Sequence, residues 1–156
     1  MILEDMTGTA DDALTTAIAS RDPQGVRTAL AGGADPNAKL GTAQALHIAA
    51  LSGPLEILTA LIDAGADVNA VGEGKDAPLH FACLGTGNKD CAAIVRRLIQ
   101  AGAEVNAMGH KGYPLDMAAL RRNTQAGVVL KEAGAKCSKE NETWVRTLCD
   151  RPSPGR

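Results

Sequence analysis

Two kinds of apolar pattern alternate along the chain, and both predict short helices. Residues 57–62 and 94–99 carry apolar side chains at the spacing of one helix face, which is typical of an amphipathic helix. Shorter steps precede them, from Leu46 to Ala49 and from Leu79 to Ala82, where a small alanine allows a neighbouring helix to approach closely. The sequence therefore predicts pairs of short helices.

These helix pairs recur. The block Leu46-His47-Ile48-Ala49 returns at 79–82, more loosely at 115–118, and in a weaker form at 14–17. A second block, Gly65-Ala66-Asp67-Val68-Asn69-Ala70, has copies at 33–38 and 102–107 and a decayed copy at 134–137. The interval from each leading leucine to its glycine is 19, 19, 23 and 19 residues. Such spacing indicates four units in one domain covering 1–156, at about 11–40, 41–73, 74–109 and 110–138. One helix pair cannot bury its apolar face alone, so the units must stack as an all-α repeat solenoid with short hairpin-like turns.

Capping residues and glycines give the expected helix ends. Asp11 or Asp12 is expected to cap the first helix, and Pro23 suits the first turn of the second helix. The glycines that follow the later second helices are expected in left-handed backbone conformations. They are Gly65, Gly102 and Gly134.

The C-terminal region predicts one further helix. Ser138 has the character of a helix start, and Trp144, Val145 and Leu148 share one face of the segment that follows. We interpret residues 139–150 as a capping helix over the last unit, and residues 151–156 as a frayed tail.

The repeated blocks resemble the ankyrin repeat family, whose unit is about 33 residues long with the signature Thr-Pro-Leu-His-x-Ala. The resemblance covers about Asp11 to Ser138 and implies an ankyrin-like stack whose concave groove holds other proteins. The chain departs from the signature at several positions. Gln44, Ala77 and Tyr113 replace the threonine, and Asp116 and Thr15 stand where the histidine is expected.

His47 and His80 occupy equivalent positions in two units. The family resemblance implies a structural role for them, in which the imidazole bonds to the backbone of a neighbouring hairpin. The alternative is a metal or acid–base site, but no Glu or Cys lies at ligand spacing from either histidine. We therefore expect no metal and no cofactor.

The composition of the chain disfavours two classes of partner, nucleic acids and membranes. Sixteen basic and eighteen acidic residues give a net charge of −2, whereas a nucleic-acid surface normally needs a basic surplus. No run reaches the roughly 20 apolar residues that a membrane span requires. We accordingly expect neither nucleic acid nor membrane as a partner, and a monomer when the chain is alone.

The N-terminus and the cysteines bear on the compartment. Acidic residues at Glu4 and Asp5 stand where a secretory signal would be basic, which favours a cytoplasmic protein. The alternative is an exported or periplasmic protein whose signal has been removed. A Cys83–Cys91 or Cys137–Cys149 disulfide would support that alternative.

No catalytic constellation is recognisable. The segment Gly85 to Asp90 is rich in glycine, but it lacks the spacing of a phosphate-binding loop and lies between two predicted helices. We interpret this segment as an inserted surface loop that adds polar contacts to one face of the stack. The sequence does not predict an enzyme.

The candidate binding residues belong to one row and its rim. Leu51, Leu84 and Leu120 each follow the signature alanine by two residues, and they form an apolar row along the groove if neighbouring helices leave them uncovered. The rim candidates are Lys39, Leu40, Ser52, Glu73, Lys75, Asp76, Lys89, His110, Lys111 and Arg121.

These residues favour a non-catalytic protein-interaction module that masks, inhibits or recruits one partner protein, an enzyme being one such partner. One alternative is a structural component of a larger assembly, bound through the end caps. Another is an exported effector or self-protection inhibitor of a hydrolase.

Overall fold

The computed structural model describes residues 3–72, 74–85 and 87–149; the side chains of residues 3–9 and of Cys149 are outside this description. The described helices and strands are α1 (Leu3–Ala19), α2 (Pro23–Ala31), β1 (Lys39–Leu40), β2 (Ala43–Gln44), α3 (Ala45–Ser52), α4 (Leu55–Asp63), α5 (Pro78–Leu84), α6 (Cys91–Gln100), α7 (Pro114–Leu120), α8 (Thr124–Glu132), the 3₁₀ turn η1 (Lys139–Asn141) and α9 (Glu142–Cys149).

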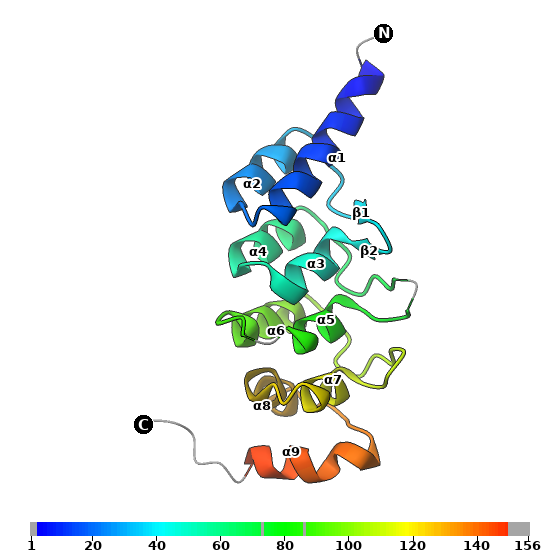
Figure 1. Ribbon diagram of the computed structural model, residues 1–156, viewed down its shortest axis with the longest axis vertical. Helices are drawn as coiled ribbons and strands as arrows, with labels where there is room; N and C mark the ends of the chain where they lie inside the picture. Colours follow the sequence, from blue (N-terminus) through cyan, green and yellow to red (C-terminus); the bar gives the residue numbers. More distant parts are fainter. Residues whose placement is uncertain (1–2, 73, 86, 150–156) are drawn as a thin grey trace.

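The helices form two parallel columns (Figure 1). The inner column contains α1, α3, α5 and α7, and the outer column contains α2, α4, α6 and α8, each pair being one repeat. Within each column, helices of successive repeats pack on one another, such as α3 on α5 and α4 on α6. The predicted all-α repeat solenoid is confirmed.

The core consists of equivalent aliphatic side chains from successive repeats. Each leading leucine of an inner helix is buried to 1% exposure or less, and the outer helices add the apolar faces that their periodicity predicts. The buried leading leucines are Leu14, Leu46, Leu79 and Leu115. Each fully buried leucine stabilises the fold by about 1.5–3 kcal/mol relative to an exposed one, so the stack depends on contacts between repeats.

Several predicted helix ends are present in the structure. Pro23 is at the start of α2, where Asp22 accepts a hydrogen bond from the Gln24 amide (3.1 Å). The glycines that follow the outer helices have left-handed φ values of 96°, 97°, 96° and 80°, which disfavour any residue with a Cβ. These are Gly33, Gly65, Gly102 and Gly134.

The expected N-terminal cap is wrong. Helix α1 begins at Leu3 and runs through both Asp11 and Asp12. No proline interrupts residues 3–10, and extending an existing helix costs far less than nucleating one. The Asp11 carboxylate instead accepts a hydrogen bond from the Asp35 amide (2.8 Å) and so joins α1 to the end of the first repeat.

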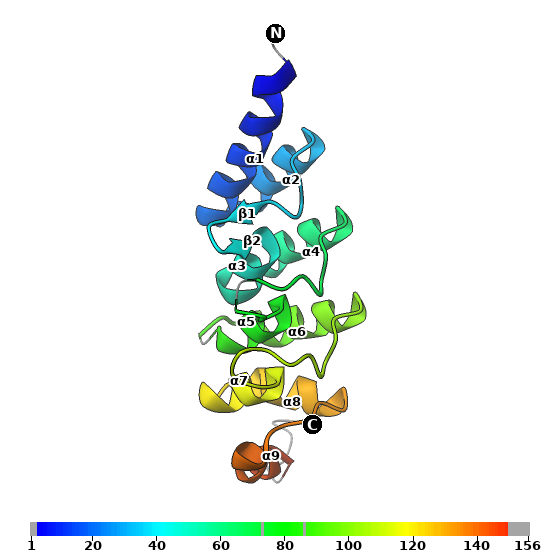
Figure 2. The same ribbon diagram turned by 90° about the vertical axis from the view of Figure 1, so that its right-hand side faces the viewer.

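At the other end, η1 and α9 cover the last repeat (Figure 2). Val145 and Leu148 are buried, and Trp144 is half-buried against the core, as the predicted stripe requires. A Cβ at Gly127 of α8 would lie 2.7 Å from Leu148 Cδ1 and 2.8 Å from Trp144 Cη2. The close approach of α9 to α8 therefore depends on this glycine. The tail at 151–156 is outside the described residues.

Candidate functional site

Loops project from the stack between each outer helix and the next inner helix (Figure 1). We call residues 38–44, 70–77 (Glu73 excepted) and 107–113 the finger loops. The first contains the antiparallel pair β1–β2, and the third contains a single bridge between Gly109 and Gly112.

Polar side chains before the finger loops join successive repeats. In each case a side-chain oxygen of one repeat accepts a hydrogen bond from a backbone amide of the next. The pairs are Asn37 Oδ1 with Asp67 N (2.8 Å), Asn69 Oδ1 with Glu104 N (2.8 Å) and Asn106 Oδ1 with Lys136 N (2.7 Å). The row fixes the spacing at which the finger loops follow one another.

The two signature histidines also position the finger loops. His47 Nδ1 accepts a hydrogen bond from the Gln44 amide (3.3 Å), so its Nε2 carries the proton and donates to the Asp76 carbonyl of the next loop (3.1 Å). Burial lowers the pKa of His47, against smaller raising effects of the backbone contacts at Asp76 and Ala70. His80 repeats this arrangement with the Ala77 amide (3.1 Å) and the Gly112 carbonyl (3.2 Å). Both rings are thus engaged in the structural role that the family resemblance implies.

Asp116 occupies the corresponding position in the last repeat, where no further finger loop follows. Its Oδ2 accepts from the Tyr113 amide (2.9 Å), while Oδ1 accepts from the Ser138 amide (2.9 Å) and from Asn141 Nδ2 (2.8 Å). Burial acts to raise the pKa of this carboxyl, but the hydrogen bonds from Ser138, Asn141 and Tyr113 together hold the pKa below its ordinary value. The segment after α8 presents hydrogen-bond donors, the Ser138 amide and Asn141 Nδ2, where the earlier repeats present a backbone carbonyl. A carboxylate acceptor therefore stands in place of the donating histidine.

The structure places the predicted rim residues of the finger loops unevenly. Lys39, Lys75, His110 and Lys111 are exposed, whereas Leu40 and Asp76 are half-buried. Asp76 Oδ1 accepts a hydrogen bond from the His110 amide (2.9 Å), so this carboxylate holds two finger loops together. Glu73 is outside the described residues.

Two exposed apolar side chains of the finger loops were missed by the sequence reasoning. Val71 is 63% exposed and Met108 is 61% exposed. Both directly follow the Asn-Ala step of the repeat, where Lys39 stands in the first repeat. The shared repeat position is the signal that could have identified them.

The predicted leucine row is only partly open. Leu51 and Leu84 are half-buried, while Leu120 is 61% exposed at the end of α7. The expected apolar row is therefore open only at Leu120, whereas Leu51 and Leu84 are partly covered.

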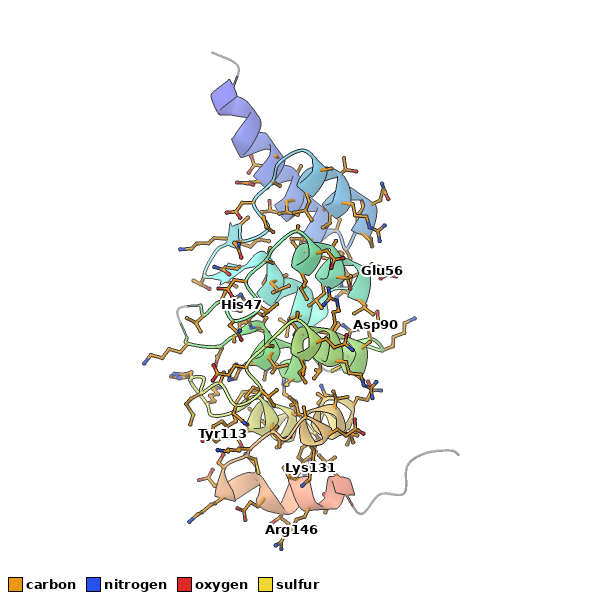
Figure 3. The ribbon with its side chains drawn as sticks, turned by 180° about the vertical axis from the view of Figure 1, so that it is seen from behind. His47, Glu56, Asp90, Tyr113, Lys131 and Arg146 are labelled. Atoms are coloured by element: carbon orange, nitrogen blue, oxygen red, sulfur yellow. The ribbon has the colours of Figure 1, made fainter. Side chains whose placement is uncertain are left out.

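The remaining candidates lie at the side of the stack away from the finger loops, as the position of Asp90 shows (Figure 3). We call the turns between inner and outer helices, residues 20–22, 53–54, 85–90 (Thr86 excepted) and 121–123, the turn edge. Leu51, Ser52 and Lys89 line a groove of about 440 Å³ there. Arg121 lines a second groove of about 350 Å³, which Lys89 also lines.

Buried polar groups fix this edge. Asn123 Nδ2 donates to the carbonyls of Cys83 and Gly85 (both 3.2 Å) and lies 3.1 Å from Cys91 Sγ, while its Oδ1 accepts from the Ala126 amide (3.2 Å). Cys83 and Cys91 are buried free thiols, and burial raises the pKa of each. A raised thiol pKa disfavours the nucleophilic thiolate.

Cys137, which the alternative of an exported protein pairs with Cys149, is also a free thiol, and the Cys149 side chain is outside the described residues. Within the described ranges, no three His, Cys, Asp or Glu side chains gather as a metal site would require. No helix in those ranges has the length and apolar character needed to cross a membrane.

A family model described as ankyrin repeats, in three copies, matches residues 46–141, which is more than half of the chain. The chain belongs to the ankyrin repeat family. The match covers the second to fourth ankyrin repeats and extends into η1. A search of curated proteins finds no match to this chain. Ankyrin repeats are in general protein–protein interaction modules and are typically non-catalytic.

Proposed function

We propose that this ankyrin protein is a non-catalytic module that holds one partner protein through its finger loops and the adjoining inner helices, and so masks, inhibits or recruits it. The observation that carries the proposal is the pair of exposed apolar side chains, Val71 and Met108, at one position of successive repeats. A single exposed apolar side chain is ordinary on a protein surface, but two at one repeat position give a regular pattern.

The surroundings of these two side chains favour a protein as the ligand. Exposed cations lie on the same loops, namely Lys75 and Lys111. An apolar centre with a charged, hydrated rim is the usual composition of a protein-binding surface. A partner with apolar side chains and an acidic rim fits it best.

The two histidines considered for an acid–base site, and the aspartate at the same repeat position, are engaged in holding the fold. His47 and His80 bond to the backbone of neighbouring finger loops, and the Asp116 carboxylate accepts three hydrogen bonds. A general acid or base needs a free lone pair or proton directed at a substrate. Their engagement supports binding rather than catalysis.

The end cap is a weaker candidate surface than the finger loops. Val145 and Leu148 of α9 are buried, and Trp144 is half-buried against the core. The apolar face of α9 is thus largely used inside the protein, and nothing among residues 138–148 favours assembly over capping.

A comparative capture experiment tests the proposal. The tagged protein and its Val71→Ser/Met108→Ser variant are used to capture proteins from the native source, with quantification by mass spectrometry. Val128→Ser is the matched control, because Val128 is 40% exposed on the outer helix α8. One protein should be enriched by the wild type and the control and reduced at least tenfold by the double variant, since interface anchors contribute about 1–2 kcal/mol each. Equal capture by all three would refute this binding surface.

A further inference from the structure

The turn edge carries a second surface, created by the insertion in the third repeat. Gly85 and residues 87–90 belong to the enlarged turn between α5 and α6, and hydrogen bonds fix residues 88 and 90 against the second repeat. Asn88 Nδ2 donates to the Gly53 carbonyl (3.1 Å), and Asp90 Oδ2 accepts from the Leu55 amide (3.3 Å). Hydrogen bonds to the second repeat therefore fix the insertion in place as part of the surface.

The inserted loop separates two grooves and lines both of them. Gly87, Asn88 and Lys89 belong to the groove of about 440 Å³ and also to the groove of about 350 Å³. The first groove extends to Arg21 of the first repeat, and the second extends to Arg121 and Arg122 of the fourth. Together the grooves run along all four repeats.

The charge of these grooves opposes that of the chain. Arg21, Lys89, Arg121 and Arg122 are exposed, and each lines one or both grooves. The turn edge has two carboxylates, Asp22 and Asp90, and each already accepts a hydrogen bond from a backbone amide. Four cations and two carboxylates leave the edge at +2, while the whole chain has a net charge of −2. Among the described residues the structure holds one salt bridge, Arg97 with Asp63, which involves none of these cations.

Two of the cations occupy backbone positions better suited to glycine. Arg21 has a φ of 56° and Arg122 a φ of 51°, and both lie directly before the N-cap residue of an outer helix. A side chain with a Cβ is disfavoured in this left-handed region. Non-glycine residues in such strained conformations cluster at functional sites. Here both residues are arginines on the turn edge.

We propose that the turn edge binds an extended, acidic segment of a partner protein. Three steps between repeats, at about 8–10 Å each, separate the first and fourth turns, so the segment spans roughly 24–30 Å. At about 3.3 Å per extended residue this corresponds to about seven to nine residues. No aromatic side chain is among the described residues that line the two grooves, and single-stranded nucleic acids depend on such side chains for base stacking. The observations thus favour an acidic peptide, and this surface is separate from the finger loops.

The test uses a fluorescein-labelled peptide of ten glutamates and the full chain, with binding followed by fluorescence anisotropy at low and at physiological salt. Arg21→Gly and Arg122→Gly remove the charge and also relieve the left-handed backbone, so neither should lower the melting temperature. Arg122→Gln removes the charge but keeps the Cβ. Lys75→Gly is the matched control, because Lys75 is a cation with a φ of 61° on a finger loop.

Each turn-edge variant should weaken binding of the ten-residue peptide about two- to five-fold, as expected for one exposed charge pair, and salt should weaken binding further. Lys75→Gly should leave the affinity unchanged. With a peptide of four glutamates, which spans about 13 Å, Arg21→Gly and Arg122→Gly should no longer act on the same bound molecule, and their effects should fall.

Three results would overturn the proposal. They are the absence of measurable peptide binding, equal weakening by Lys75→Gly, and tighter binding of a ten-nucleotide oligothymidylate with the same dependence on the arginines. Loss of partner capture by the Val71→Ser/Met108→Ser variant with peptide binding intact would support both surfaces separately. Loss of peptide binding in that same variant would show that the peptide lies on the finger loops and would contradict this proposal alone.

Discussion

Replacing Asp116 by asparagine should selectively loosen the C-terminal cap. The carboxylate is 2% exposed and accepts three hydrogen bonds, two of them from Ser138 and Asn141 at the start of the cap. Asparagine has nearly the same shape, but its amide nitrogen must face at least one of these donors. Loss of one charge-assisted bond together with a donor facing a donor destabilises the fold by about 2–4 kcal/mol. For a domain of this size that corresponds to a fall in melting temperature of about 5–15 °C.

Tryptophan fluorescence reports on the C-terminal cap in this test. Trp144 is the one tryptophan of the chain, and it lies in α9. Its fluorescence during urea unfolding follows the cap, while far-ultraviolet circular dichroism follows all repeats. In Asp116→Asn the fluorescence transition should move to lower urea than the dichroism transition, because contacts in a repeat stack are local. Asp63→Asn is the control, since this carboxylate is 64% exposed in its pair with Arg97 and should change stability by less than about 1 kcal/mol.

The same variant has a defined pH dependence. The folded-state pKa of Asp116 lies below its ordinary value of 3.8, so near that pH the unfolded state binds more protons and stability rises with pH. The contribution of Asp116 is therefore complete above that value and is lost as the pH falls through the folded-state pKa. The wild type should exceed Asp116→Asn in stability at pH 6, and the difference should shrink below about pH 4. Coincident transitions for the two proteins at pH 6 would refute the assigned role of this carboxylate.

Three further substitutions test the packing by urea unfolding. Asn69→Ala should lower stability by about 1 kcal/mol, because the Glu104 amide loses its acceptor. An unchanged urea midpoint would show that the asparagine row does not stabilise the stack. Gln44→Thr should raise stability by about 1 kcal/mol, since Gln44 Oε1 is buried with no hydrogen-bond partner among the described residues; a loss would mean that the amide is satisfied in solution. Gly127→Ala should displace α9 and shift Trp144 emission, because the new Cβ would meet the indole ring; an unaltered spectrum would contradict the packing of the cap.

The repeat architecture could be predicted because its signals are local and periodic. The leading leucines and the glycines after the outer helices follow from intervals of 19, 19, 23 and 19 residues within the repeats, and the stripe on α9 lies within residues 144–148. The sequence predicts too short a first helix, because Asp11 and Asp12 fit an N-cap and the weak helix formers Thr7, Gly8 and Thr9 precede them. Asp11 consequently reads as a cap in the sequence but is a link to Asp35 in the structure.

The binding surface was less predictable, because exposure depends on the neighbouring repeat. Leu51 and Leu120 occupy the same repeat position, yet Leu51 is half-buried and Leu120 is exposed. The third repeat lies beside Leu51, whereas Leu120 belongs to the last repeat, which has no further repeat beside it. The two grooves of the turn edge likewise depend on the placement of residues 87–90. That placement is set by contacts with Gly53 and Leu55, more than 30 residues away in sequence.

Hydrogen–deuterium exchange of the full chain, with and without its captured partner, tests the central claim most directly. If the stack binds a protein through its finger loops and the adjoining inner helices, the partner should slow exchange in the finger loops, notably around Val71 and Met108, and leave exchange in the outer helices α4 and α6 unchanged. Slowed exchange confined to the outer helices or to α9, with the finger loops exchanging at their free rate, would contradict the claim.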